Sequence, residues 1–226
     1  MYFNSLDCVL NCVVREPELE PKHKIFLSHS GFQKDFTEQL CVDLERWQYY
    51  PFFDKRPDSL PKGRKFPQLI FQAAQHCKVT VLILSEEYFT RTKWPMLELE
   101  AFVDAQKKNH ETIAILPMYL GLSRRECTEN VARRSHWVSV WRKWAEVDKR
   151  INVRKWEEAL RVLGPSNGIE YVKSLGEVTL RKDIVDAVRH LVRPENMWSA
   201  GQIQGGTRIC KVRKSHIFLR ILAYVQ

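Results

Sequence analysis

Residues 22–36, KHKIFLSHSGFQKDF, are the stretch that decides the fold. A short apolar run at 25–27 stops abruptly at SHSG (28–31), and a helical pattern then begins. Apolar residues recur at spacings of four, four, four and three, at Phe32, Phe36, Leu40, Leu44 and Trp47. This spacing predicts a helix with one buried apolar face, and Ser30 stands where an N-cap residue is expected.

The rest of the chain alternates short apolar runs with helical periods, which is typical of βαβ units and a parallel sheet. The predicted strands are 24–28, 50–53, 79–84, 112–118 and a short one at 170–172. Five strands with alternating helices predict an α/β, flavodoxin-like fold. Its five-stranded parallel sheet would have the order 2-1-3-4-5, with helices on both faces.

Four further helical regions are predicted. They are 66–76, a helix that begins at Pro95, a tryptophan-rich region at 125–162, and 178–191. Pro95 suits the first position of a helix because proline has no N–H to donate. In the helix that begins at Pro95, the predicted buried positions are Leu99, Phe102 and Val103. In the helix at 178–191, they are Ile184, Val188 and Leu191.

In a sheet of this order, ligands bind beyond the carboxyl ends of the strands, between the first and the third. The first predicted strand ends at Ser28-His29-Ser30, and the third is followed by Ser85. These side chains are therefore expected at the rim of a ligand crevice. The alternative is that Ser30 only caps the helix and that His29 is an ordinary loop histidine.

The composition suits one globular domain with tails. The chain has 226 residues, 44% of them hydrophobic and 28% charged. The predicted divisions are an N-terminal tail (1–21), the domain (22–193) and a C-terminal extension (194–226). No apolar run reaches the roughly 18 residues of a membrane span, and the N-terminus does not read as a signal peptide.

Six cysteines are scattered with no C-x-x-C pair. This pattern argues for reduced thiols in a cytosolic protein rather than for disulfides or a zinc site. The formal net charge of +9 attracts polyanions such as nucleic acid, phosphates and anionic lipid. Runs of charge are more often simply solvated faces.

Several short motifs stand in order along the chain. They are KIFLSHS (24–30), PFFD (51–54), IFQAAQHC (70–77), VTVLILSEEYFTRTKWPMLEL (79–99), ILPMY (115–119) and WEEAL (156–160). Together they resemble the TIR domain over about 22–193, most closely its plant branch. The family motif W-C-L-x-E-L stands here as WPMLEL (94–99), which keeps the acid but replaces Cys and Leu. The first strand ends in Ser-His-Ser, where many resistance-protein TIR domains have Ser-Phe-Arg.

Many TIR domains cleave NAD+ between nicotinamide and ribose, so the resemblance implies an NAD+ nucleosidase, a hydrolase with Glu98 as its catalytic residue. NAD+ would be the substrate, and no metal or other cofactor is expected. Nicotinamide leaves as a neutral molecule, so one ionised carboxylate suffices to stabilise the ribosyl oxocarbenium ion. We expect Glu98 to be ordinarily ionised, because it falls in the first turn of a helix. The alternative is an ordinary glutamate on a helix surface.

The expected substrate contacts come from several segments. Ser28, His29 and Ser30 would bond to ribose or phosphate, Arg64 and Lys65 would attract the pyrophosphate, and Ser85 would lie at the crevice rim. Trp94 is expected either to stack on a base or nicotinamide or to belong to the core. Tyr88 is expected to pack rather than to act in catalysis.

The resemblance implies a homo-oligomer in which the loop around 54–65 is donated across an interface, and an innate-immune or cell-death signal. Attack by water on the oxocarbenium ion would give ADP-ribose, and attack by the same nucleotide would give a cyclic isomer. Two alternatives stay open: a non-catalytic TIR–TIR adaptor, and a nucleic-acid-binding module whose binding would be sensitive to salt.

Overall fold

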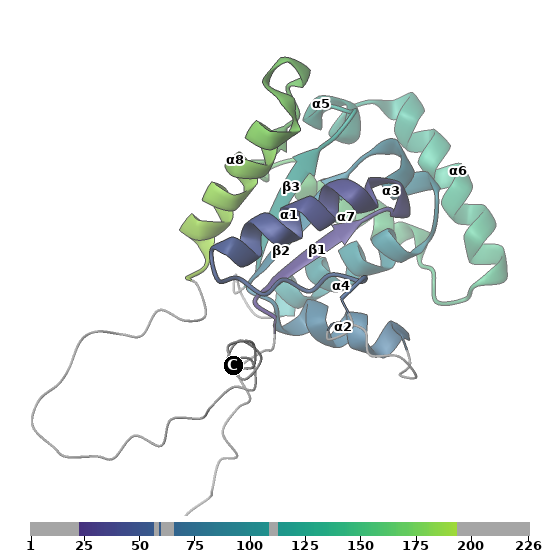
Figure 1. Ribbon diagram of the computed structural model, residues 1–226. Helices are drawn as coiled ribbons and strands as arrows, with labels where there is room; N and C mark the ends of the chain where they lie inside the picture. The colour runs from purple at the N-terminus through teal and green to yellow at the C-terminus, as the bar shows by residue number, and fades with distance from the viewer. Residues whose placement is uncertain (1–22, 57–58, 60–65, 109–112, 194–226) are drawn as a thin grey trace, which may run out of the picture. The chain divides into compact units, whose positions relative to one another are not determined.

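The computed structural model describes residues 23–56, 59, 66–108 and 113–193. The predicted tail (1–21) and extension (194–226) lie outside the described residues. Within the described residues, parallel strands form one sheet (Figure 1). They are β1 (Ile25–His29), β2 (Val79–Leu84), β3 (Ala114–Tyr119) and β4 (Ile169–Glu170).

The strand order is β1-β2-β3-β4, with every neighbouring pair parallel. The register pairs Ile25 with Val79 and Val79 with Ala114, so the carboxyl ends of the three long strands lie at one edge. The predicted parallel α/β fold is therefore confirmed, with four strands in place of five.

The predicted second strand, 50–53, is reduced to an isolated parallel bridge between Phe52 and Phe26. Phe52 donates its N–H to the carbonyl of Ile25 and accepts from the N–H of Leu27, on the side of β1 away from β2. The segment keeps the position predicted for the second strand, next to the first, without forming a ladder.

The helices are α1 (Lys34–Arg46), α2 (Phe66–His76), α3 (Glu86–Thr90), α4 (Trp94–Lys108), α5 (Arg124–Thr128), α6 (Val131–Val147), α7 (Val153–Leu163) and α8 (Gly176–Leu191). Single 3-10 turns occur at η1 (Gly31–Gln33) and η2 (Lys173–Leu175). The helix predicted at 66–76 is confirmed, and the tryptophan-rich region forms α5, α6 and α7. The five-residue helix α3 was not predicted, because it is too short to show a helical period.

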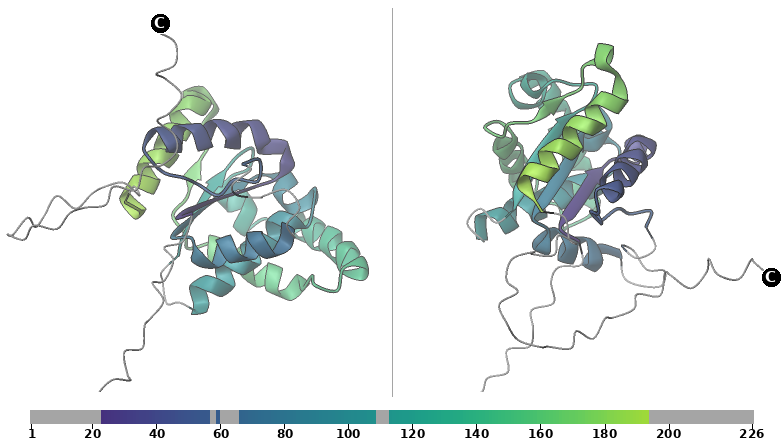
Figure 2. Two further views of the ribbon diagram at one scale, coloured as in Figure 1. Left: turned by 60° about the horizontal axis from the view of Figure 1, so that its bottom comes forward. Right: turned by 60° about the vertical axis from the view of Figure 1, so that its left-hand side comes forward.

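Alternating side chains send the two faces of the sheet into separate apolar clusters. Ile25, Leu27, Val79 and Val81 pack with α1 and α8, whereas Phe26 and Leu82 face the cluster that includes α2, α4, α6 and α7. Figures 1 and 2 show α1 and α8 on one face of the sheet and α2 and α4 on the other. The helices on both faces are as predicted.

The predicted apolar faces are confirmed in their centres and wrong at their ends. Phe36, Leu40 and Leu44 are buried, and so are Leu99, Phe102, Val103, Ile184 and Val188. Phe32, Trp47 and Leu191, however, are 65%, 48% and 48% exposed. Phe32 lies in the 3-10 turn before α1, Trp47 follows its last residue, and Leu191 is the last residue of α8. At the ends of a helix the backbone departs from regular helical geometry, so the sequence period no longer predicts which side chains are buried.

Cys41, Cys77 and Cys127 are buried free thiols, as the cysteine pattern predicts. The other three cysteines lie outside the described residues. Within the described ranges, no helix combines the length and the apolar character that a membrane span needs.

Candidate functional site

A cavity of about 190 Å³ lies at the carboxyl end of β1. Its walls come from β1, from the segment of the Phe52 bridge, from α2 and from the start of α4. The lining residues are Phe26, Leu27, His29, Gly31, Phe52, Asp54, Ile70, Thr92, Trp94, Pro95 and Glu98. Most of these walls are apolar, and the polar groups gather at His29, Asp54 and Glu98.

Glu98 borders this cavity and is 9% exposed. It lies one turn into α4, which starts at Trp94 and carries Pro95 in its first turn. Its Oε2 atom is 2.6 Å from the Oγ of Ser28 on β1, and this hydroxyl donates to the carboxylate when Glu98 is ionised. The start of α4 and the end of β1 therefore hold the carboxyl group between them.

Burial raises the pKa of Glu98 to about 7. The hydrogen bond from Ser28 and the charge of His29 lower this pKa, and the negative charge of Asp54 raises it. The expectation of an ordinarily ionised carboxylate is therefore wrong. Removal of the carboxylate from water outweighs the favourable hydrogen bond and the helix N-terminus.

The Ser28 hydroxyl has a second partner. It lies 2.8 Å from the Oη of Tyr88 on α3, and this phenol also lies 3.0 Å from the carbonyl oxygen of Pro95. Ser28 and Tyr88 are both completely buried. Glu98 is thus the end nearest the cavity of a buried, hydrogen-bonded chain of oxygen atoms that joins β1, α3 and α4.

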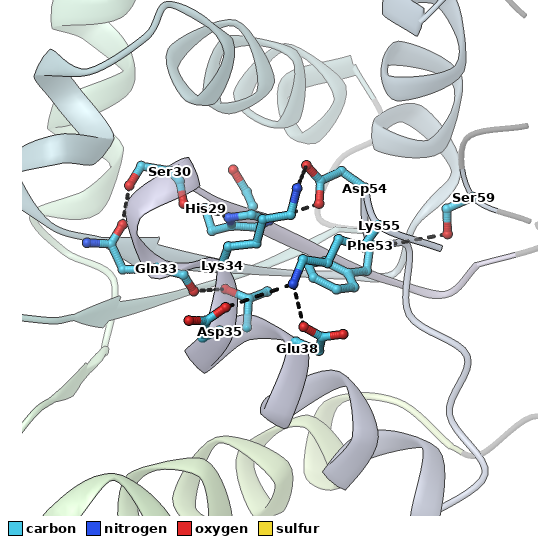
Figure 3. Close-up of polar contacts among 12 residues, drawn as sticks. His29, Ser30, Gln33, Lys34, Asp35, Glu38, Phe53, Asp54, Lys55 and Ser59 are labelled. Atoms are coloured by element: carbon cyan, nitrogen blue, oxygen red, sulfur yellow. Dashed lines mark hydrogen bonds and ion pairs between the residues drawn. The ribbon is translucent and has the colours of Figure 1, made fainter. Parts of the chain in front are cut away.

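A second polar cluster lies at the tip of β1, where Figure 3 shows His29, Lys34 and Asp54 converging. The Nε2 of His29 is 3.4 Å from one oxygen of Asp54, and the Nζ of Lys34 is 3.6 Å from the other. The Nδ1 of His29 lies 2.7 Å from the carbonyl of Ser30, to which it donates. Burial works against the charge on Asp54, but His29 and Lys34 hold its pKa below the ordinary value.

The segment that follows Asp54 is tied to α1 by further contacts (Figure 3). Lys55 pairs with Glu38 and lies 3.9 Å from Asp35. The N–H of Phe53 donates to the Oγ of Ser59 at 3.3 Å. These contacts fix the chain on both sides of Asp54, so that its carboxylate is held beside the cavity.

Trp94 forms another wall of the cavity and is half-buried. The Nζ of Lys93 and the Cζ of Arg150 lie 5.7 and 5.8 Å from the centre of its ring. Both cations pair with Asp148, whose pKa is lowered chiefly by its hydrogen bond with Arg150. The indole thus has two cations near it, and their attraction to the ring helps to hold it in position.

The matches with known proteins agree with this architecture. The family model described as "TIR domain" matches residues 25–155. This chain belongs to the TIR domain family. No curated protein matches it.

Among solved structures, this TIR domain is similar to the TIR domains of the activated Roq1 resistosome that directly recognises the pathogen effector XopQ. The identity is 18%, the TM-score is 0.59, and the match covers 74% of this chain and 99% of that one. The RPS4 and RRS1 TIR domain heterodimer matches with 14% identity and a TM-score of 0.45, covering 75% of this chain and 98% of that one. The likeness to the Roq1 domains shows the fold.

The structure of this TIR domain brings three of the predicted site residues together at the cavity: His29, Trp94 and Glu98. Trp94 lines the cavity and also packs against the core, and its stacking on a base or nicotinamide stays a prediction. Ser28 lies behind Glu98 rather than in the cavity wall. Its hydroxyl contacts the acid itself, and its contact with ribose or phosphate stays a prediction.

Ser30 and Ser85 lie away from the cavity. Ser30 is buried, caps η1 and bonds to the side chain of Gln33. Ser85 caps α3 and lines a separate hollow of about 520 Å³, together with Gln33 and Glu87. Neither serine lines the cavity at Glu98. Arg64 and Lys65 lie outside the described residues.

Two residues of this site were missed by sequence reasoning. Asp54 was noted only as part of the PFFD motif, and its position after a short apolar segment beside the first strand was the available signal. Tyr88 was expected to pack, which it does, but its hydroxyl also contacts Ser28. A contact across 60 positions leaves no signal in a single sequence.

Proposed function

We propose that this TIR domain cleaves the bond between nicotinamide and ribose in NAD+, with Glu98 as the catalytic residue. One observation carries the proposal: Glu98 borders a small cavity that is also lined by His29, Asp54 and Trp94. Such a site suits a flat, cationic ring held against a carboxylate. The pyridinium ring of NAD+ has both properties.

The chemistry requires little from the protein beyond this carboxylate. As the glycosidic bond breaks, positive charge leaves the pyridinium ring and develops on the ribose. An ionised Glu98 stabilises that oxocarbenium ion and orients the ribose hydroxyls. The leaving nicotinamide is neutral and needs no proton, so a second carboxyl group acting as a general acid is unnecessary. Asp54 is kept ionised by His29 and Lys34, which suits it to a role in positioning rather than in proton donation.

The size of the cavity supports binding of part of NAD+ rather than all of it. Cavities that enclose a whole drug-sized ligand measure roughly 300–1,000 Å³, and this one measures about 190 Å³. The nicotinamide end fits such a volume, and the remaining nucleotide needs further walls. We propose that self-association supplies them, with the loop around 54–65 of a second copy completing the site.

The residues have distinct proposed roles. His29 bonds to ribose or phosphate from the tip of β1, and Trp94 stacks on the nicotinamide ring. Arg64 and Lys65 remain proposed partners of the pyrophosphate. Ser28 acts through Glu98. The second product is ADP-ribose if water attacks the oxocarbenium ion, or a cyclic isomer if an atom of the same nucleotide attacks it.

We further propose that this reaction serves innate-immune or cell-death signalling in the cytoplasm. The family membership and the likeness in fold to the Roq1 TIR domains, which belong to a resistosome, support this setting. The competing function is that of a TIR–TIR adaptor without catalysis.

Incubation of the purified protein with NAD+ over a range of protein concentrations tests the proposal. Nicotinamide release that rises more steeply than the protein concentration is the expected result, because the complete site needs a second copy. The mass of the other product separates hydrolysis from cyclisation. If the protein self-associates but releases no nicotinamide, the proposed cleavage is contradicted and the adaptor function is the better explanation.

A further inference from the structure

The buried chain of hydroxyl groups behind Glu98, formed by Ser28 and Tyr88, ends on a carbonyl oxygen that can only accept hydrogen bonds. Its three contacts are Glu98 Oε2 to Ser28 Oγ at 2.6 Å, Ser28 Oγ to Tyr88 Oη at 2.8 Å, and Tyr88 Oη to the carbonyl of Pro95 at 3.0 Å. The Pro95 carbonyl carries no proton, so the phenol must donate to it for that contact to be a hydrogen bond. Tyr88 then accepts from Ser28, and Ser28 must in turn accept from Glu98.

Three contacts between oxygen atoms need three protons. Ser28 and Tyr88 supply one each, and the third comes from Glu98 only when Glu98 is a carboxylic acid. If Glu98 is ionised, Ser28 turns its proton toward the carboxylate. Tyr88 can then satisfy either Ser28 or Pro95, and the other contact is left without a proton. In a buried site, an unsatisfied pair of oxygens is unfavourable.

We propose that Tyr88 is a positioning residue which, through Ser28, holds Glu98 in the carboxylic-acid form while the site is empty. A cationic ring in the cavity reverses this preference, because it stabilises the carboxylate. The O–H bond of Glu98 then breaks, its proton passes to solvent, and the Ser28 hydroxyl turns from Tyr88 to the carboxylate. This last step rests on the proposed function, whereas the state of the empty site does not.

The charged neighbours of Glu98 do not account for this preference by themselves. His29 at the end of β1 favours the carboxylate, and Asp54 from the neighbouring segment opposes it. These two groups lie 3.4 Å apart and act on the pKa of Glu98 in opposite directions. Tyr88, from α3, adds a negative charge only if it ionises, and burial raises its pKa well above the ordinary value. The preference of Glu98 for the carboxylic-acid form is therefore attributed to its burial and to the number of protons in the hydrogen-bonded chain.

Two conservative variants are expected to move Glu98 in opposite directions. Tyr88→Phe removes the acceptor that Ser28 uses only when Glu98 is protonated, so the carboxylate is favoured. Ser28→Ala removes the donor that the carboxylate uses, so the acid is favoured. General damage to the structure would not produce shifts of opposite sign.

The test is a carbon-13 NMR titration of the side-chain carboxyl carbons of glutamate in the full-length protein, without NAD+. The Glu98 signal is identified by its loss in Glu98→Gln. The expected midpoint in the wild type is near neutral pH. Tyr88→Phe should lower it by roughly half to one pH unit, and Ser28→Ala should raise it.

A midpoint in the ordinary carboxyl range in the wild type would overturn the inference without the use of any variant. A midpoint that Tyr88→Phe leaves unchanged or raises would overturn it as well. Because NAD+ is absent, this result is independent of catalysis. If the titration behaves as expected and NAD+ is not cleaved, the inference about Tyr88 stands and the proposed function falls.

Discussion

The Oγ atom of Ser28 lies 2.6 Å from the Oε2 atom of Glu98, although the two residues stand 70 positions apart in the sequence. The first comes from β1 and the second from the first turns of α4. This contact ties the carboxyl group of Glu98 to the buried strand β1. Glu98 also borders the cavity. The properties of the acid therefore depend on β1 as much as on its own helix.

The first prediction concerns the pH dependence of NAD+ cleavage. In the proposed reaction the carboxylate form of Glu98 is the active one, and burial raises the pKa of this group to about 7. Activity should therefore be low in the acid range and rise with pH through about 7. A profile of kcat/KM across this range tests it. Activity that is already at its maximum near pH 5 would show that a buried Glu98 does not limit the reaction.

The second prediction concerns stability in Glu98→Gln. Because the pKa of Glu98 is raised from 4.5 to about 7 on folding, the free energy of unfolding is greatest below pH 4.5 and declines as pH rises through about 7. This interval corresponds to roughly 3 kcal/mol. A neutral amide avoids the loss, so Glu98→Gln should be more stable than the wild type by about 1–3 kcal/mol at pH 8, and by less than about 1 kcal/mol at pH 5.

Urea unfolding of both proteins at the two pH values measures this difference. Glu146 on α6 is exposed and offers a matched control. Glu146→Gln should change stability little and by the same amount at both pH values. A Glu98→Gln protein that is less stable than the wild type at pH 8 would contradict the account of Glu98 as a carboxyl group that is unfavourably ionised.

The third prediction concerns Trp94. Its ring lines the cavity between Lys93 and Arg150. Loss of the ring in Trp94→Ala should lower kcat/KM about fivefold, which corresponds to the roughly 1 kcal/mol that an aromatic contact contributes. Trp94→Phe, which keeps an aromatic face, should lose less. Equal losses in the two variants, with unchanged circular dichroism, would indicate that stacking is not the role of Trp94.

The fourth prediction concerns Gly168, which precedes β4. A Cβ atom at this position would lie 2.6 Å from the carbonyl oxygen of Pro117 and 2.8 Å from the ring of Tyr119. Gly168→Ala should therefore reduce the free energy of unfolding by about 1–3 kcal/mol. At Gly31 a Cβ atom would meet nothing within 4 Å. Gly31→Ala is the matched control, and an equal effect of both variants on stability would contradict the prediction.

The strands of the sheet could be predicted from sequence because they depend on local patterns, and their order followed from the expected fold class. Apolar runs at 25–27 and 79–84 lie in strands that are buried on both faces, and each is followed by a helical period. The prediction was less accurate where a segment has the composition of a strand but forms few backbone hydrogen bonds with its neighbour. The segment 50–53 has the composition of a strand, yet only Phe52 pairs with β1 through both of its backbone groups.

The candidate site was predictable in its place but not in its chemistry. The carboxyl end of the first strand and the family motif indicated His29, Trp94 and Glu98, and these three line one cavity. The burial of Glu98 was not predicted, because its helix was expected to expose its first turn. That turn is covered instead by Ser28 and Tyr88, whose contacts arise only when β1, α3 and α4 pack together.

The most direct test of the central claim compares nicotinamide release by the wild type and by Glu98→Gln. Both proteins would be incubated with NAD+ at a concentration at which self-association has been verified, and the products separated by chromatography with mass detection. We predict steady release by the wild type and none by a folded Glu98→Gln protein. Equal release by the two proteins would contradict the assignment of Glu98, and no release by the associated wild type would contradict the enzymatic function itself.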